Sequence, residues 1–177
     1  SATDFAGCRV AGLTAGASTP AGIIKEVKTT MSEEIKSTET MEEYLAMPKA
    51  RQAELKDVGG YVGGTFTGDR RKASSVEGRD LVTLDLDSIP AGQTEDILKR
   101  VSGLGCASMV YSTRKHAGYA PRLRVVIPLD RTVTADEYEP VARKIASLIG
   151  IRFCDPTTFE ASRLMYWGSC CPSTLAQ

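Results

Sequence analysis

The stretch Leu81–Asp87 limits the possible folds more than any other part of this 177-residue sequence, because its residues alternate strictly between apolar and polar. In an extended chain, alternate side chains point to opposite faces. The apolar set is Val82, Leu84 and Leu86, and the polar set is Thr83, Asp85 and Asp87. The pattern predicts a strand with one face against a core, and with two carboxylates on the other face.

The following segments supply the rest of a β-α-β-β-α-β order. Residues 94–104 have helical spacing of apolar side chains, and residues 106–113 and 122–129 are predicted strands. Thr134 and Glu137 form a capping box that begins a helix, Gly150 ends it, and residues 164–167 are the last predicted strand. This order predicts an α+β fold with an RRM/ferredoxin-like core. We expect two helices on one sheet face and an open opposite face, preceded by a charged helical extension over residues 32–57 that Pro48 interrupts.

Two arginines are expected on the same face as the carboxylates. Alternation in the strand 122–129 places Arg122 and Arg124 there, and turns Leu123 toward the helices. Two carboxylates at positions i and i+2 of a strand lie about 6.5–7 Å apart at Cα, close enough to share Mg²⁺ or Mn²⁺. A guanidinium binds phosphate oxygens bidentately. The alternative is a strand that merely ends in a polar turn; the matched arginines favour metal and phosphate chemistry.

Further polar residues are candidates for the same site. Asp155 follows the second helix and is the candidate third acid, although it also begins an Asp-Pro turn. Asp130 is a rival, but its surroundings resemble an ordinary loop entry. His116, the only histidine, lies just after a strand and beside the arginines, which favours a phosphate contact over a role in the core.

Composition excludes several classes of protein. Lys plus Arg equals Asp plus Glu, at 22 each, so the net charge gives no sign of a nucleic-acid partner. Three basic clusters are nevertheless present, at residues 70–72, 114–116 and 122–124. The five cysteines suggest buried or incidental thiols, and zinc is a weak alternative without a CxxC pair. Without a membrane-spanning run or a signal peptide, a cytoplasmic protein is expected.

Several ordered motifs resemble a known family. They lie in the segments Lys56–Gly64, Leu81–Asp87, Pro121–Leu129, Asp155–Glu160 and Arg163–Trp167. Residues 41–173 resemble the archaeo-eukaryotic primase (AEP) type of primase–polymerase domain, found at the front of phage and prophage replication proteins. The superfamily carries an acid-x-acid motif, a small-x-His motif and a later acid. The resemblance implies that Asp85 and Asp87 are the first motif, His116 belongs to the second and Asp155 is the third, although Arg114 replaces the small residue.

The resemblance also implies an activity. Such a domain is a metal-dependent nucleotidyltransferase that joins nucleoside triphosphates on a DNA template in phage or mobile-element replication. The implied catalytic residues are Asp85, Asp87, Asp155 and His116, and the three aspartates are the implied ligands of Mg²⁺ or Mn²⁺. The implied nucleotide-binding residues are Lys115, His116, Arg122, Arg124 and Arg163. A replicative helicase of the virulence-associated protein E type is the implied partner, as a domain or a separate protein.

The N-terminal segment resembles a different family. Residues 10–27 are similar to the C-terminal tail of hydroxymethylbutenyl diphosphate reductase, in which the serine matching Ser18 helps to bind the substrate diphosphate. The cluster cysteines of that family lie in segments absent here, so no reductase activity is expected. We therefore divide the chain into a reductase-tail-like segment, 1–31, and a primase–polymerase-like domain, 32–177.

Other classes of function fit the sequence less well. A non-catalytic nucleic-acid-binding RRM-like module would show aromatic residues on its central strands, where this chain has acids and arginines. A rolling-circle nicking enzyme would need paired histidines. An inactive prophage remnant with the same fold stays open.

Overall fold

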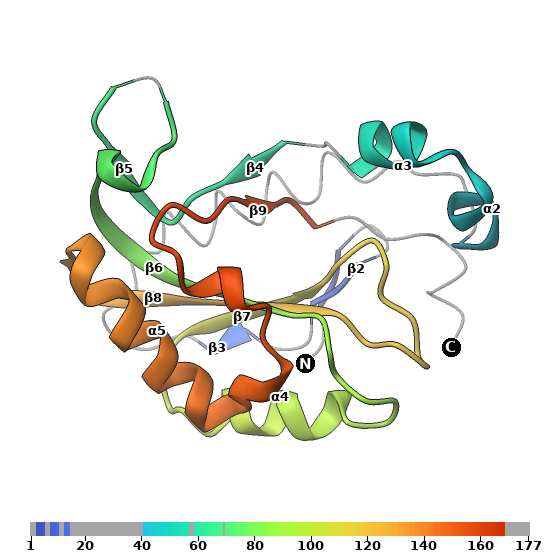
Figure 1. Ribbon diagram of the computed structural model, residues 1–177. Coiled ribbons are helices and arrows are strands. Elements are labelled where there is room, and N and C mark those ends of the chain that lie inside the picture. The colour runs from blue at the N-terminus through green and yellow to red at the C-terminus, as the bar shows by residue number, and fades with distance from the viewer. Residues whose placement is uncertain are drawn as a thin grey trace.

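The computed structural model describes residues 3–5, 8–10, 13–14, 41–56, 59–68 and 70–168. Its centre is an antiparallel five-stranded sheet with the order β3-β7-β8-β6-β5 (Figure 1). These strands are β3 (Leu13–Thr14), β7 (Ser108–Ser112), β8 (Leu123–Val133), β6 (Val76–Leu86) and β5 (Gly64–Phe66). Two small sheets pair β1 (Thr3–Phe5) with β2 (Cys8–Val10), and β4 (Gly60–Tyr61) with β9 (Met165–Tyr166).

Helices cover one face of the central sheet. The helices α4 (Thr94–Ser102) and α5 (Ala135–Ile149) pack on that face, whereas α2 (Met41–Ala46) and α3 (Lys49–Lys56) lie apart from them (Figure 1). The core between sheet and helices takes alternate residues from each strand, including Val82, Leu84 and Leu86 of β6 and Leu123, Val125 and Ile127 of β8. The predicted α+β fold and the direction of this alternation are therefore confirmed.

The second core helix, α5, has the ends that its sequence predicts. Thr134 accepts a hydrogen bond from the backbone amide of Glu137, and the Glu137 side chain accepts one from the amide of Thr134. Gly150 follows the helix with φ of 141°, in the range that favours glycine. The short 3₁₀ turns η2 (Ile151–Phe153) and η3 (Pro156–Phe159) then carry the chain back to β6.

The last strand differs from the expectation. Between α5 and residue 168, where the described part of the chain ends, a single isolated antiparallel bridge joins the chain to β6, between Cys154 and Leu86. Pro156 has no backbone N–H to donate to a sheet, and η3 begins at this residue. The predicted strand at 164–167 is present as β9, but it pairs with β4 instead of joining the central sheet.

The opposite face of the sheet is also not open. A second apolar cluster of Leu81, Met109, Tyr111 and Val126 lies on this face, and Tyr61 of β4 and Trp167, just after β9, pack against it. The rings of Tyr61 and Trp167 stack with their centroids 4.6 Å apart. The β4–β9 pair therefore covers part of the face that we expected to be free.

Two arginines, one in β6 and one in β8, are buried. Arg79 of β6 is fully buried and donates to the carbonyl oxygens of Leu81 and Ala161 and to the hydroxyls of Thr83 and Tyr138. Burial lowers the pKa of Arg79, partly offset by Tyr138. These bonds fix the segment around residue 161 against β6. The second buried arginine, Arg124, belongs to the candidate site described below.

The helical extension has the break that Pro48 predicts, between α2 and α3. Tyr44 of α2 is buried, and its hydroxyl donates to the carbonyl oxygen of Gln52 in α3. Ser18 of the reductase-tail-like segment lies outside the described residues. Leu13 and Thr14 pair with β7 at the edge of the sheet, and the division at residue 31 stays a prediction. No described helix is long and apolar enough to cross a membrane.

Candidate functional site

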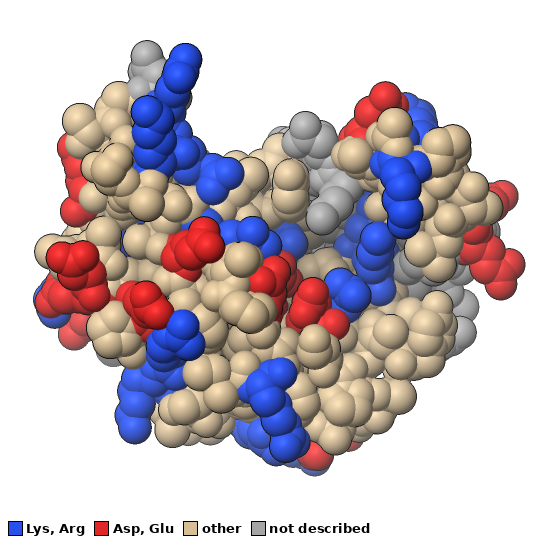
Figure 2. Space-filling model, in the orientation of Figure 1, with Lys and Arg blue, Asp and Glu red and all other residues tan. Residues whose placement is uncertain are grey.

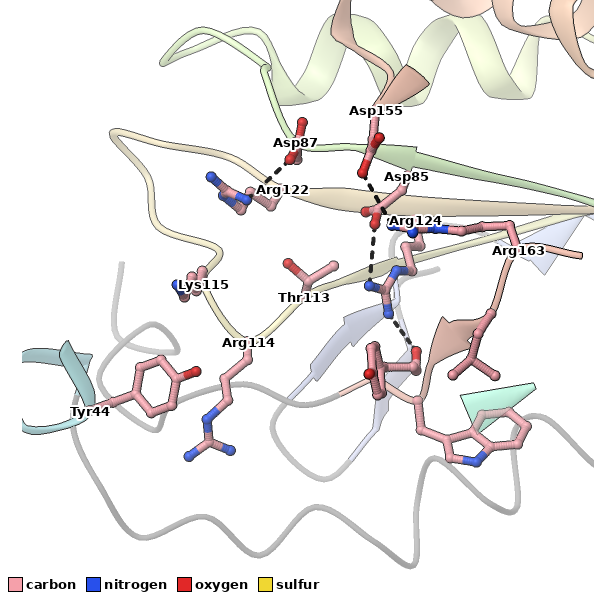
Figure 3. A pocket seen from close by; sticks show the side chains of 13 residues that line it. Tyr44, Asp85, Asp87, Thr113, Arg114, Lys115, Arg122, Arg124, Asp155 and Arg163 are labelled. Carbon is pink, nitrogen blue, oxygen red and sulfur yellow. Dashed lines mark hydrogen bonds and ion pairs between the residues drawn. The ribbon is translucent and has the colours of Figure 1, made fainter. Parts of the chain in front are cut away.

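A polar pocket of about 140 Å³ lies at the end of β6 (Figure 3). The start of β8, the β7–β8 loop, residues 155–167 and the helix α2 contribute the other walls. Its charged residues are Asp85, Asp87, Asp155, Arg114, Lys115, Arg122, Arg124 and Arg163, and its other residues are Tyr44, Thr113, Leu164, Tyr166 and Trp167. Seven of the eight sequence-predicted site residues therefore line one pocket, and His116 is the exception.

Asp85 and Arg124 form the buried pair of the site. They lie opposite each other in the register of β6 and β8, with Arg124 Nη2 3.3 Å from Asp85 Oδ2. Their side chains are only 11% and 8% exposed, respectively. Arg124 also donates to the carbonyl oxygen of Tyr166. Burial lowers the pKa of Arg124, but Tyr111 and Asp85 outweigh it and leave the pKa raised.

Asp87 and Arg122 form a second, more exposed pair. Arg122 Nη1 lies 3.3 Å from Asp87 Oδ2, and the two side chains are 37% and 35% exposed, respectively. The backbone amide of Asp87 donates to the carbonyl oxygen of Phe153, which holds the end of β6 against η2. The other carboxylate oxygen, Oδ1, accepts from the Ser88 hydroxyl at 3.3 Å.

Asp155 reaches the same pocket from the other side of β6. Its backbone amide donates to the carbonyl oxygen of Asp85 at 2.8 Å. Asp155 Oδ1 caps η3 by accepting from the amide and hydroxyl of Thr157, and Oδ2 lies 3.2 Å from Arg163 Nη2. Although burial opposes the shift, the bonds from Thr157 and the charge of Arg163 hold the pKa of Asp155 below its usual value.

The thiol of Cys154 is buried near the three acids of the pocket. Burial, followed by the charges of Asp85, Asp155 and Asp87, raises the pKa of Cys154 to about 11. A thiol with this pKa stays protonated at neutral pH and is a poor nucleophile. Cys154 is therefore a buried thiol that packs beneath the site.

His116 lies beside the pocket, in the β7–β8 loop. Its Nδ1 is 3.1 Å from the backbone nitrogen of Arg122 and 3.2 Å from the Arg122 carbonyl oxygen. That carbonyl oxygen already accepts from the amide of Thr113, whereas the Arg122 N–H needs an acceptor. We therefore assign Nδ1 as the acceptor, which leaves the proton on Nε2. Burial lowers the pKa of His116, which favours this neutral form.

Sequence reasoning missed several residues of the pocket. Arg114 is buried, with its guanidinium 4.7 Å from the centre of the Tyr44 ring. Tyr44 lies in the predicted helical extension and Arg114 in one of the basic clusters, and neither was predicted as a site residue. The signal for Arg114 was its departure from the family motif, but no local pattern predicts that α2 approaches the β7–β8 loop. Tyr166 and Trp167 were predicted as strand residues without a role in the site.

The pocket has the type of ligand atom that a divalent cation binds, but the carboxylates are not placed around a common point. Three carboxylates on one pocket supply the hard oxygen donors that Mg²⁺ and Mn²⁺ prefer. Within the described part of the chain, however, no three His, Cys, Asp or Glu side chains are arranged to hold a metal ion. One oxygen of each carboxylate is instead paired with an arginine. The donor set therefore fits a cation, provided that the arginines change partners.

One solved structure and one family model are similar to this chain. In structure, the chain is similar to the AEP domain of the primase–polymerase of cyanophage S-2L, with a TM-score of 0.44 and 14% sequence identity. That similarity covers 73% of this chain and 65% of the other, less than two thirds of its length. No curated protein matches the sequence. The family model described as the VapE N-terminal domain matches residues 22–174, which confirms the predicted resemblance to proteins of the virulence-associated protein E type. Because the match extends over most of its length, this chain belongs to the VapE N-terminal domain family.

Proposed function

We propose that this chain is the catalytic domain of a DNA primase–polymerase, which transfers nucleotides from nucleoside triphosphates to a growing strand. The observation that carries the proposal is the pocket in which three carboxylates and five cationic side chains meet. The cationic excess suits a polyphosphate, and the carboxylates suit the cations that accompany it. The family membership and the primase-type motifs support the same assignment.

The arginines differ in the roles that they can have. Arg122 and Arg163 are about one third exposed and can turn toward a ligand, so we assign them, with Lys115, to the triphosphate. His116 would add a neutral N–H donor from Nε2. Arg124 is buried between Asp85 and the Tyr166 carbonyl, so we assign it to holding Asp85 in place. The ring of Trp167 in the pocket wall offers apolar surface for the nucleoside.

In the proposed reaction, the 3′-hydroxyl oxygen of the primer attacks the α-phosphorus. A phosphorus–oxygen bond forms there, the bond to the β-phosphate bridge breaks, pyrophosphate leaves and the hydroxyl proton passes to water. Asp85, Asp87 and Asp155 would hold the divalent cation. When bound, Mg²⁺ or Mn²⁺ would neutralise the phosphate charge and favour ionisation of the hydroxyl. The protein contributes position and charge, as in other phosphoryl transfers.

The template strand needs a path other than the covered sheet face. We propose that it passes the basic arm, which we define as the exposed residues Arg70, Arg71 and Lys72 of the β5–β6 connection. Figure 2 shows this connection projecting beside a hollow, with acidic side chains between groups of basic ones. Arg71 donates to the carbonyl oxygen of Ser162 at 2.6 Å, next to Arg163 of the pocket. The arm therefore stands close enough to hold the phosphates of a strand that enters the pocket.

The proposal is tested by incorporation of labelled nucleotides on a primed DNA template with Mg²⁺ or Mn²⁺. Replacing Asp85 and Asp87 together by Asn should reduce incorporation at least about a hundredfold, because a bound metal supplies several kcal/mol to such reactions. The matched control replaces Asp96 and Asp130, which lie outside the pocket, by Asn. Equal incorporation by parent and site variant would exclude this mechanism.

A second candidate is a domain that binds nucleotides or nucleic acid without catalysis. The pairing of every pocket aspartate with an arginine favours it, because this arrangement holds an anion site without a metal. Triphosphate binding without incorporation, under all metals tested, would support this candidate. A replicative helicase, as a domain or a separate protein, remains our proposed partner for either function.

A further inference from the structure

Each aspartate of the pocket is held by its own arginine. The closest oxygen–nitrogen distances are 3.3 Å for Asp85–Arg124, 3.3 Å for Asp87–Arg122 and 3.2 Å for Asp155–Arg163. Figure 3 shows these pairs as neighbouring contacts in one pocket, formed by side chains at the end of β6, at the start of β8 and in the segment after α5. This one-to-one pairing is the feature that the proposed function leaves unexplained.

At Asp87 and Asp155, the arginine and the neighbouring residue bind different oxygens of the same carboxylate. Asp155 Oδ1 accepts hydrogen bonds from the amide and hydroxyl of Thr157. Oδ2, which accepts from Arg163, is therefore the oxygen of Asp155 that could coordinate a cation. Asp87 has a similar division, with Oδ1 accepting from Ser88 and Oδ2 from Arg122. A cation that needs these Oδ2 atoms must therefore compete with the arginines for them.

A displaced arginine keeps its charge, because a guanidinium does not lose its proton in a protein. It therefore needs another anion, and a polyphosphate offers oxygens spaced for bidentate bonds. Arg122 and Arg163 are exposed enough to turn, at 37% and 32%. Arg124 has no such freedom, since it is buried and also bonds the carbonyl oxygen of Tyr166.

We propose that Arg122 and Arg163 are exchangeable partners that couple cation binding to polyphosphate binding. In the free protein they occupy Asp87 and Asp155 and keep divalent cations out. A polyphosphate draws the two arginines away and releases the carboxylates for the cation. This inference rests on the proposed function, and it adds that the site binds a cation and a polyphosphate together and either one alone poorly. By linkage, each ligand strengthens the other by the same factor.

The test measures Mn²⁺ binding without any phosphate, by electron paramagnetic resonance of free Mn²⁺. Removing the competitor should help the cation, so Arg122→Gln and Arg163→Gln should each bind Mn²⁺ up to about fivefold more tightly than the parent, the factor for a partly exposed ion pair. The control Arg131→Gln, which breaks an exposed pair with Glu137 on α5, should leave Mn²⁺ binding unchanged. Melting curves confirm that each variant is folded.

A double variant separates partner exchange from a general change of charge. If Arg122 acts by occupying Asp87, the gain should vanish when Arg122→Gln is combined with Asp87→Asn. If Arg122→Gln still raises Mn²⁺ affinity in the Asp87→Asn background, the inference is overturned, because the increase would then come from the loss of a positive charge and not from the release of Asp87. The Arg163→Gln and Asp155→Asn pair gives the same test at the second carboxylate.

The reciprocal experiment measures, by calorimetry, the binding of inorganic tripolyphosphate in the absence of metal. Asp87→Asn releases Arg122 and should tighten tripolyphosphate binding, whereas the Arg122→Gln/Asp87→Asn double variant should lose that gain. If the parent binds Mn²⁺ and neither arginine variant binds it more tightly, this inference is overturned and the proposed function stands. Failure of every variant to bind Mn²⁺, even with tripolyphosphate present, would overturn both.

Discussion

Both faces of the central sheet bury apolar side chains, but the face away from α4 and α5 also buries charged groups of the site. Under α4 and α5, the strands contribute Leu, Val and Ile side chains that need only the right volume and an apolar neighbour. On the other face, beside the apolar cluster of Leu81 and Tyr111, Asp85 and Arg124 are buried as a hydrogen-bonded charged pair. Burying such groups is unfavourable unless each one is paired. The first face therefore stabilises the fold, and the second fixes the positions of charges at the site.

The largest expected effect comes from placing a charge on the apolar face. Leu123 is buried in the core beneath the helices, between Arg122 and Arg124 in sequence. Leu123→Lys should unfold the domain, because the ammonium group has no partner there. Circular dichroism and a melting curve give the readout, with Leu123→Met as the volume-conserving control. A folded Leu123→Lys variant would show that the two faces tolerate charge equally.

The next effect separates the buried pair of the site from the exposed one. Asp85→Ala leaves Arg124 buried without its carboxylate and should lower the free energy of unfolding by about 3 kcal/mol. Asp87→Ala breaks a pair that is one third exposed and should change it by less than about 1 kcal/mol. Urea titrations of both variants measure the difference. Equal losses would mean that burial does not distinguish the two pairs, and Arg124 would lose its assigned structural role.

The sequence predicted much of this contrast. Alternation alone placed Asp85 opposite the apolar face, because a strand reverses its side chains at every residue. It gave no sign that β4 and β9 cover this polar face, since each is two residues long and forms only by pairing with the other. The burial of Arg79 was equally hidden, because its neighbours Glu77 and Asp80 are polar and an arginine is rarely buried. Local pattern thus predicts which face a residue takes, whereas long-range pairing decides what covers that face.

A smaller effect is expected at the basic arm, outside both faces. Replacing Arg70 and Lys72 by Gln removes two exposed cations and retains Arg71, which is bonded to Ser162. If the arm binds phosphates, the slope of log K against log salt concentration for single-stranded DNA should become shallower by about 1.4. Each lost phosphate contact contributes about 0.7 to this change. Fluorescence anisotropy at several salt concentrations measures this slope.

The matched control for the arm removes two exposed cations from the helix-covered side of the molecule. Lys99 of α4 and Lys144 of α5 replaced by Gln should leave the slope unchanged, although the net charge falls equally. Triphosphate binding should be unaffected in both variants, because none of these lysines or arginines lines the pocket. Equal slopes for arm variant and control would place the DNA elsewhere.

The smallest expected effect concerns His116, at the rim between the pocket and the loop. Burial lowers the pKa of this histidine, so the unfolded chain takes up a proton before the folded one as pH falls. Its neutral form therefore contributes stability that is fully present above the unfolded pKa of about 6.5, and that declines as pH falls through the interval below it.

His116→Asn removes the titration while keeping a side-chain oxygen that can accept the Arg122 N–H. Melting temperatures from about pH 8 to about pH 5 should fall more steeply for the parent than for His116→Asn. Parallel curves would mean that His116 has the same proton affinity in both states, and that the Nδ1–Arg122 bond does not select the neutral ring.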